Sequence, residues 1–223
     1  MHGIILLIVG TLELILGISF LVKKRVGEAA RWYSLFILSV VVWVLTNAAM
    51  ALSDSASLLY YFTEMTYAGS MFIAPTFLLF SYTFPAPKKA ISTAFTVLLF
   101  VPAIINIFIV FLSDLYIKNL EIVNGSVQET FDWMIYVFSA LFVIYWIWGI
   151  FNLVGSYKKS DGLYRWQLKY LLIGIAISSI VGIAFDILLP LFGINFSGRN
   201  WIGAEFSIVW LGFTSYILFK KNI

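Results

Sequence analysis

Along the chain, long runs of apolar residues alternate with short polar connections. A helix needs about 20 apolar residues to cross the hydrocarbon core of a bilayer. Runs of this length predict seven membrane-spanning helices, at about residues 3–22, 32–52, 59–83, 91–112, 133–155, 167–190 and 201–219. The third run departs most from the pattern, because Glu64 and Pro75 lie inside it. We therefore expect residues 1–223 to form a single all-α membrane domain, a seven-transmembrane helix bundle.

The longest polar connection, at residues 113–133, has a different pattern. Asn124 and Gly125 form a pair that favours the tight turn of a β-hairpin, and β-favouring residues such as Val123 and Val127 flank them. These residues predict a short β-hairpin at about 115–131, between the fourth and fifth helices. Asn124 also begins a glycosylation sequon, but the turn accounts for the same residues and we favour it.

Composition agrees with a membrane protein and removes several kinds of chemistry. Of the 223 residues, 62% are hydrophobic and 11% are charged, whereas soluble domains carry roughly 25% charged residues. The chain has no cysteine, and its single histidine is His2. Disulfides, thiol catalysis and a histidine ligand or base inside the membrane are therefore excluded. We expect no catalytic residue, no metal and no cofactor, because no enzyme motif is present and residues 201–219 contain no lysine for a retinal Schiff base.

The positive charges lie almost entirely on one side of the predicted bundle. Of the fourteen lysines and arginines, all but Lys118 and Arg199 fall in the first, third and fifth connections or in the C-terminal tail. The positive-inside rule places these segments in the cytoplasm. We expect a multi-pass protein of the plasma membrane, with its N-terminus outside and its C-terminus cytoplasmic. Topology thus explains the basic pI of about 9.0, and we expect no nucleic-acid partner.

The first helix is predicted to stay in the protein. Residues 3–22 lack the basic n-region and the small-residue cleavage site of a signal peptide.

Several polar residues interrupt the predicted helices. Glu13 lies near the middle of the first helix, and four others lie in the outer halves of their helices, namely Asn47, Glu64, Asp186 and Glu205. Ionisable groups inside membranes usually face the bundle interior or a water-filled cavity. One hypothesis is an outer ligand-binding or proton site formed by Asn47, Glu64, Asp186, Arg199 and Glu205. The alternative is that these residues only make helix-packing hydrogen bonds or lie at the hydrated membrane boundary.

Spacing predicts which face of its helix Asp186 occupies. Gly174, Ser178, Gly182 and Asp186 recur at every fourth position and form one ridge. Small residues at this spacing let another helix approach closely. We therefore expect Asp186 to point toward protein rather than lipid.

The order of several degenerate motifs resembles a known family. The motifs are Trp43 and Asn47 in the second helix, "FSYTFP" at 80–85, the run "YRWQLKYLLIGIAISSIVGIAFDILLPLFG" at 164–193, and "YILFKK" at 216–221. In this order they resemble the N-terminal seven-transmembrane sensor region of histidine kinases, over nearly the whole chain. The resemblance implies an input module that signals through its seventh helix to a cytoplasmic output domain. The chain departs from the family in having Asp186 where an asparagine is typical.

No output domain follows Lys221, so we expect either a stand-alone sensor that acts through a partner or a relation of fold without signalling. The leading hypothesis is a non-catalytic sensory module that binds a small molecule from the outer side. Its expected partners are the lipid bilayer, that ligand, a cytoplasmic signalling protein and, as an open alternative, a second copy in a homodimer.

The competing hypothesis is a small transporter of three plus one plus three helices, coupled to protons through a carboxyl group of Glu13, Glu64, Asp186 or Glu205. A weak internal similarity between residues 17–32 and 149–166 favours it.

Overall fold

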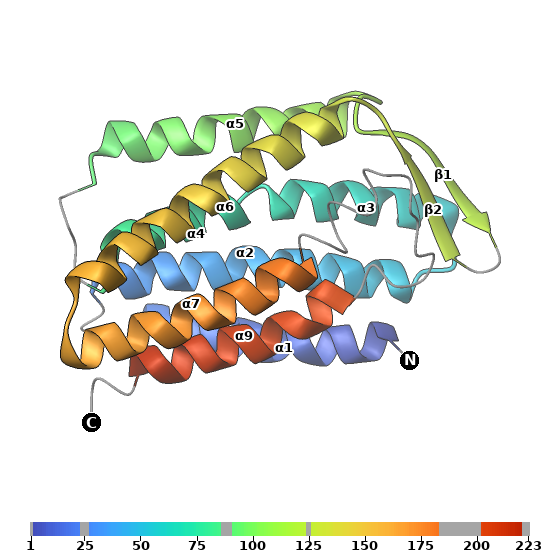
Figure 1. Ribbon diagram of the computed structural model, residues 1–223. Helices are drawn as coiled ribbons and strands as arrows, with labels where there is room; N and C mark the ends of the chain where they lie inside the picture. The colour runs from blue at the N-terminus through green and yellow to red at the C-terminus, as the bar shows by residue number, and fades with distance from the viewer. Residues whose placement is uncertain (1, 23–26, 86–90, 124–125, 183–201, 220–223) are drawn as a thin grey trace.

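The computed structural model describes residues 2–22, 27–85, 91–123, 126–182 and 202–219. The helices lie alongside one another in an elongated bundle (Figure 1). They are α1 (His2–Val22), α2 (Glu28–Ala51), α3 (Ala56–Ser70), α4 (Ile73–Thr83), α5 (Thr93–Leu112), α6 (Met134–Lys159), α7 (Gly162–Gly182) and α9 (Ile202–Phe219). Within the described ranges, α1, α2, α5 and α6 are each long and apolar enough to cross a membrane. The architecture agrees with the predicted all-α membrane fold.

Large apolar side chains cover the outside of the bundle. Ile8 on α1 is 56% exposed, and Leu98 and Phe108 on α5 are 67% and 60% exposed. Contiguous apolar surface of this kind is rare on proteins that face water. These faces are therefore suited to lipid.

The predicted third helix consists of two helices in the structure. α3 ends at Ser70 and α4 begins at Ile73, so the chain is interrupted at Met71 and Phe72 inside the expected range 59–83. Pro75 lies in the first turn of α4 and has no N–H for the carbonyl of Met71. The proline explains why the helix stops and restarts here.

Aromatic rings fill the centre of the bundle, where α2, α4, α6 and α9 meet. The rings of Phe77 and Trp146 stack with centroids 4.2 Å apart, and Phe36 meets Trp210 edge-on at 5.2 Å. Gly149 allows this packing, because a Cβ at that position would lie 2.5 Å from the ring of Phe77. The centre of the bundle is therefore closely packed.

The connection after α5 contains the strands β1 (Ile117–Val123) and β2 (Ser126–Phe131), which pair antiparallel. Ile122 pairs with Val127, and the register shifts between Ile117 and Asn119. The predicted turn residues Asn124 and Gly125 lie outside the described residues.

Aromatic residues join the base of the strands to the helices. We call Tyr67, Asn106, Tyr116, Phe131 and Phe138 the hairpin cluster. The ring of Tyr67 lies 5.6 Å from that of Phe131 and 6.1 Å from that of Tyr116. The Tyr116 hydroxyl donates to Asn106 Oδ1 at 2.9 Å, and Asn106 Nδ2 donates to the Pro102 carbonyl at 2.7 Å. Burial raises the pKa of the Tyr116 phenol, so the folded cluster favours the neutral phenol.

The two ends of the bundle differ in charge. The strands and the start of α1 lie at one end, and α9 finishes at the other (Figure 1). Asp54, Asp114 and Asp132 lie in connections at the strand end, where Lys118 Nζ is 3.4 Å from Asp132 Oδ2. The described basic residues of the opposite end are Arg31, Lys158, Lys159, Arg165 and Lys169.

Candidate functional site

The structure describes three of the five residues predicted for an outer site. Asn47 donates to the carbonyl of Trp43 in its own helix at 2.8 Å. Glu64 is half-buried on α3. Glu205 Oε1 on α9 lies 3.4 Å from Nδ1 of His2 on α1. Among the described residues, no hydrogen bond or ion pair joins any two of these three, and Asp186 and Arg199 lie outside the described ranges.

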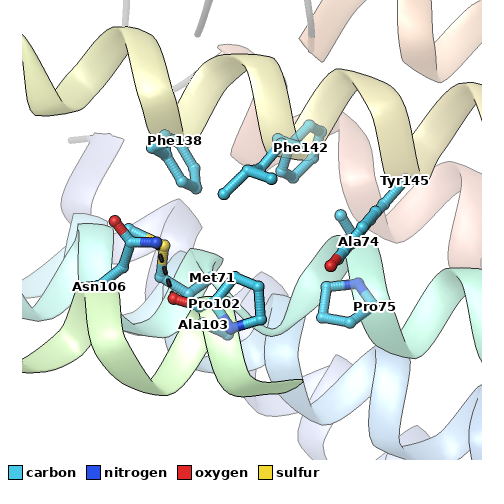
Figure 2. A pocket seen from close by; sticks show the side chains of 10 residues that line it. Met71, Ala74, Pro75, Pro102, Ala103, Asn106, Phe138, Phe142 and Tyr145 are labelled. Carbon is cyan, nitrogen blue, oxygen red and sulfur yellow. Dashed lines mark hydrogen bonds between the residues drawn. The ribbon is translucent and has the colours of Figure 1, made fainter. Parts of the chain in front are cut away.

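A small cavity lies between the α3–α4 break, α5 and α6. It has a volume of about 20 Å³ and is lined by Met71, Ala74, Pro75, Pro102, Ala103, Asn106, Phe138, Leu141, Phe142 and Tyr145. Figure 2 shows Phe138 and Phe142 facing the two prolines across it. A space of this size holds about one water and is far too small for a drug-sized ligand. The cavity contains none of the predicted site residues.

The most distinctive polar feature of the described structure follows α9. We call it the α9 seam, and it consists of Glu13, Tyr33, Gln167, Ser207 and Ser215. Side chains from three other helices reach α9 within it, at three successive levels. All five residues are buried or half-buried.

The first level of the α9 seam joins α1 to α9. Glu13 has no exposed surface, and its Oε1 lies 2.6 Å from Ser207 Oγ. Ser207 Oγ also lies 2.6 Å from the Ala204 carbonyl oxygen of its own helix. Among the described residues, this is the only contact in which a carboxyl group from another helix meets a polar group of α9 inside the bundle.

The second level joins α2 to α9. The Tyr33 hydroxyl donates to the Leu211 carbonyl at 2.9 Å and lies 3.2 Å from Ser215 Oγ. Ser215 Oγ donates to the same Leu211 carbonyl at 2.6 Å. One carbonyl inside α9 therefore accepts hydrogen bonds from two side chains, one of which comes from another helix.

The third level joins α7 to α9. Gln167, which is 1% exposed, donates from Nε2 to the Ile217 carbonyl at 2.9 Å. Buried polar groups between helices fix their relative position, because an unpaired polar group in an apolar interior is costly. The three levels therefore define where α9 sits along the bundle.

Several polar atoms beside these contacts are buried without a hydrogen-bond partner in the described part of the chain. They are Glu13 Oε2, Gln167 Oε1, Ser178 Oγ, Trp210 Nε1 and Thr214 Oγ1. Each unsatisfied group costs about 1–3 kcal/mol relative to a paired one. Such clusters are uncommon and usually have a functional or strain-related reason.

One part of the predicted small-residue ridge is visible. Gly174 on α7 faces Trp210 on α9, and a Cβ there would lie 2.6 Å from Cδ1 of the indole. Ser178 follows one turn later with its hydroxyl buried. The ridge thus faces protein at Gly174 and Ser178, and its last member, Asp186, is outside the described residues.

Sequence reasoning singled out Glu13 but missed Tyr33, Gln167, Ser207 and Ser215. Serine, tyrosine and glutamine are common at helix boundaries, and nothing in their spacing marks a shared contact. The flanking Gly10 and Gly17 give a usable signal, because a Cβ at either position would lie within 3.1 Å of a leucine on α2. They show that the Glu13 face of α1 is packed against another helix.

Comparison with known proteins identifies a family for the chain. A family model described as the N-terminal 7TM region of histidine kinase matches residues 5–220. None of the curated proteins matches the chain.

Proposed function

Because the chain belongs to this family of N-terminal 7TM regions of histidine kinases, we propose that it is a non-catalytic sensory module that passes a signal through α9. The family and the apolar helices support a multi-pass membrane protein with a role in signal transduction. In the proposed orientation the strand end faces outward across the plasma membrane, and α9 finishes on the cytoplasmic side. The charge difference between the two ends supports this orientation.

The single observation that carries the proposal is the α9 seam. Glu13, Tyr33 and Gln167 come from three different helices, and each holds a different level of α9. Unsatisfied polar atoms flank these contacts, so the observed arrangement gives up stability that another arrangement of α9 can recover. A helix with two arrangements of similar free energy is what a transmembrane switch requires.

The input lies at the strand end in this proposal. Asn47 and Glu205 lie on the half of their helices nearer that end, Glu64 lies near the middle of α3, and Asp186 and Arg199 complete the proposed ligand set. Glu205 and Ser207 lie in the first two turns of α9, so a small molecule that binds Glu205 acts directly on the first level of the α9 seam. The ligand shifts α9 only by the difference between its affinities for the two arrangements.

The output lies at the other end of α9. A cytoplasmic signalling protein is the proposed receiver, and a homodimer is the alternative assembly. The bilayer surrounds the exposed faces of α1 and α5.

Spin labels on α9 test the proposal. The chain has no cysteine, so single cysteines at the exposed positions Val209 and Phe213 provide unique attachment sites. A small molecule that binds from the outer side is expected to change label mobility at one or both positions, and not at Phe108 on α5. A molecule that binds while both α9 labels stay unchanged contradicts the proposal, and proton flux in vesicles that is lost in Asp186→Asn would favour transport instead.

A further inference from the structure

Glu13 is a titratable group in an unusual position. It is the twelfth residue of the 21-residue α1, which at about 1.5 Å per residue places it roughly 14–17 Å from either end of the helix. The side chain has no exposed surface. An ionised carboxylate at this depth is costly unless a cation or several donors reach it.

The contacts of Ser207 indicate the protonation state of Glu13. Ser207 Oγ lies 2.6 Å from Glu13 Oε1 and 2.6 Å from the Ala204 carbonyl oxygen. A serine hydroxyl has one proton and can donate to only one of these oxygens. The carbonyl has no proton to give, so both contacts are hydrogen bonds only when Glu13 is a carboxylic acid that donates to Ser207 Oγ. Ser207 then donates to Ala204.

The unpartnered second oxygen agrees with this assignment. In the part of the chain that the structure describes, Glu13 Oε2 is buried and has no hydrogen-bond partner. In the neutral acid this atom is a carbonyl oxygen, whereas in the carboxylate it shares a full negative charge. Leaving it unpaired is much less costly in the first case.

Among the described residues of α1, α2 and α9, no charged side chain forms an ion pair with Glu13. The titratable or charged side chains of α1, α2 and α9 besides Glu13 are His2, Glu28, Arg31, Tyr33, Glu205 and Tyr216. Tyr33 approaches the same seam from α2, but its proton is donated to the Leu211 carbonyl. Glu205 and His2 interact with each other. Arg31 is in the first turn of α2, whereas Glu13 lies between glycines that contact Leu38 and Leu45.

We propose that Glu13 is a proton-binding site that links the position of α9 to proton occupancy. The docked arrangement holds the proton between Glu13 Oε1 and Ser207 Oγ. Loss of the proton leaves a carboxylate with at most one donor in an apolar interior, and separation of α9 from α1 relieves this by admitting water. The link to α9 rests on the proposed function, whereas the protonated state of Glu13 does not.

Infrared spectroscopy of the full chain in lipid bilayers tests the proton site directly. At neutral pH we expect a C=O stretching band of a protonated carboxyl that disappears in Glu13→Gln and persists in the matched variants Glu64→Gln and Glu205→Gln. Ser207→Ala is expected to shift the frequency of the band, because the acid loses its acceptor. Absence of the band at neutral pH, or its survival in Glu13→Gln, would overturn the proposal whether or not α9 transmits a signal.

Distance measurements test the link to α9. Spin labels at the exposed positions Ile15 on α1 and Val209 on α9 report the separation of the two helices. We expect a longer distance at alkaline pH in the wild type and in Glu205→Gln, because the separated state binds fewer protons. Glu13→Gln should keep the short distance at every pH, since its amide can donate to Ser207 Oγ as the acid does. A pH-independent distance in the wild type would overturn the link.

Discussion

The hairpin cluster and the α9 seam are both buried contacts between distant parts of the chain, but they are built differently. In the hairpin cluster the rings of Tyr67, Tyr116 and Phe131 pack together, and the Tyr116 hydroxyl and the Asn106 amide are both hydrogen-bonded. In the α9 seam, the polar groups are spread over four helices, and several neighbouring polar atoms have no hydrogen-bond partner among the described residues. The hairpin cluster therefore favours a single arrangement. In the α9 seam, the unsatisfied polar groups lower the stability of the observed arrangement relative to a competing arrangement of α9.

The difference separates two tasks within one bundle. Close aromatic packing with satisfied hydrogen bonds favours a single conformation. A half-satisfied network is the weaker structure and allows a competing arrangement. The region that holds the strands in place is thus distinct from the region proposed to move.

Removing the central ring of the hairpin cluster should have the largest effect. Tyr116 is 1% exposed, and replacing a buried aromatic side chain with alanine costs about 3–5 kcal/mol. We expect Tyr116→Ala to lower the free energy of unfolding in bilayers by about this amount and to expose residues 113–133 to protease. A loss below about 1 kcal/mol would show that the cluster is not a rigid anchor.

Adding a methyl group at Gly174 should disturb the α9 seam from the α7 side. A Cβ there would lie 2.6 Å from Trp210 Cδ1, and overpacking a close contact costs about 1–3 kcal/mol. Gly174→Ala should therefore destabilise the protein and increase label mobility on α9. The control is Gly155→Ala, where a Cβ meets nothing within 4 Å, and which should be stabilising by about 0.5–1 kcal/mol. Equal effects of the two substitutions would contradict the close α7–α9 contact.

A matched pair of hydroxyl deletions compares the two regions directly. Tyr116→Phe leaves Asn106 Oδ1 buried without its donor, which costs about 1–3 kcal/mol. Tyr33→Phe should cost only about 0.5–1 kcal/mol, because Ser215 still donates to the Leu211 carbonyl. Tyr33→Phe should nevertheless give the larger increase in α9 label mobility. The reverse ranking in mobility would argue that the α9 seam does not hold α9.

The stabilising effect of the Tyr116 hydroxyl should depend on pH. Folding raises the pKa of the Tyr116 phenol, so this group favours the folded state fully below the unfolded value of about 10 and less as the pH rises above it. The stability difference between the wild type and Tyr116→Phe should therefore shrink in alkaline solution, as measured by unfolding at several pH values. A difference that grows would contradict the burial of the phenol.

The smallest effect is expected at the third level of the α9 seam. Gln167 makes one bond to Ile217 but also leaves Oε1 unsatisfied, so its two contributions nearly cancel. Gln167→Leu has a similar size and should change the free energy of unfolding by no more than about 1 kcal/mol. A loss of several kcal/mol would show that Gln167 is an anchor of the same kind as Tyr116.

The sequence allowed most helix positions to be predicted, but not the contacts between them. The ranges 3–22, 91–112 and 201–219 agree within two residues with α1, α5 and α9, because apolar length is a direct consequence of bilayer thickness. The break before Pro75 was signalled only by the proline itself, since a proline within an apolar run can also be accommodated by a gentle kink. Helix existence is a local property, whereas continuity depends on the surrounding helices.

The α9 seam could not be predicted, because its partners are far apart in the sequence and chemically ordinary. Glu13 stood out as a charge among apolar residues, and its flanking glycines indicated a packed face. Ser207, however, is one of several serines in the predicted helices, and Tyr33 resembles an interfacial anchor of the kind that ends many helices. Only the three-dimensional arrangement shows that α1, α2 and α7 converge on one helix.

The contact between Glu13 and Ser207 joins residues 194 positions apart, which has a consequence for how the protein is made. α1 is synthesised before α9, so the acid of α1 enters the bilayer before its partner exists. Until then, the bilayer holds a helix whose central carboxyl group has no partner on α9, which is a costly state. Completion of the α9 seam therefore gives this acid the partner that it lacks when α1 enters the bilayer.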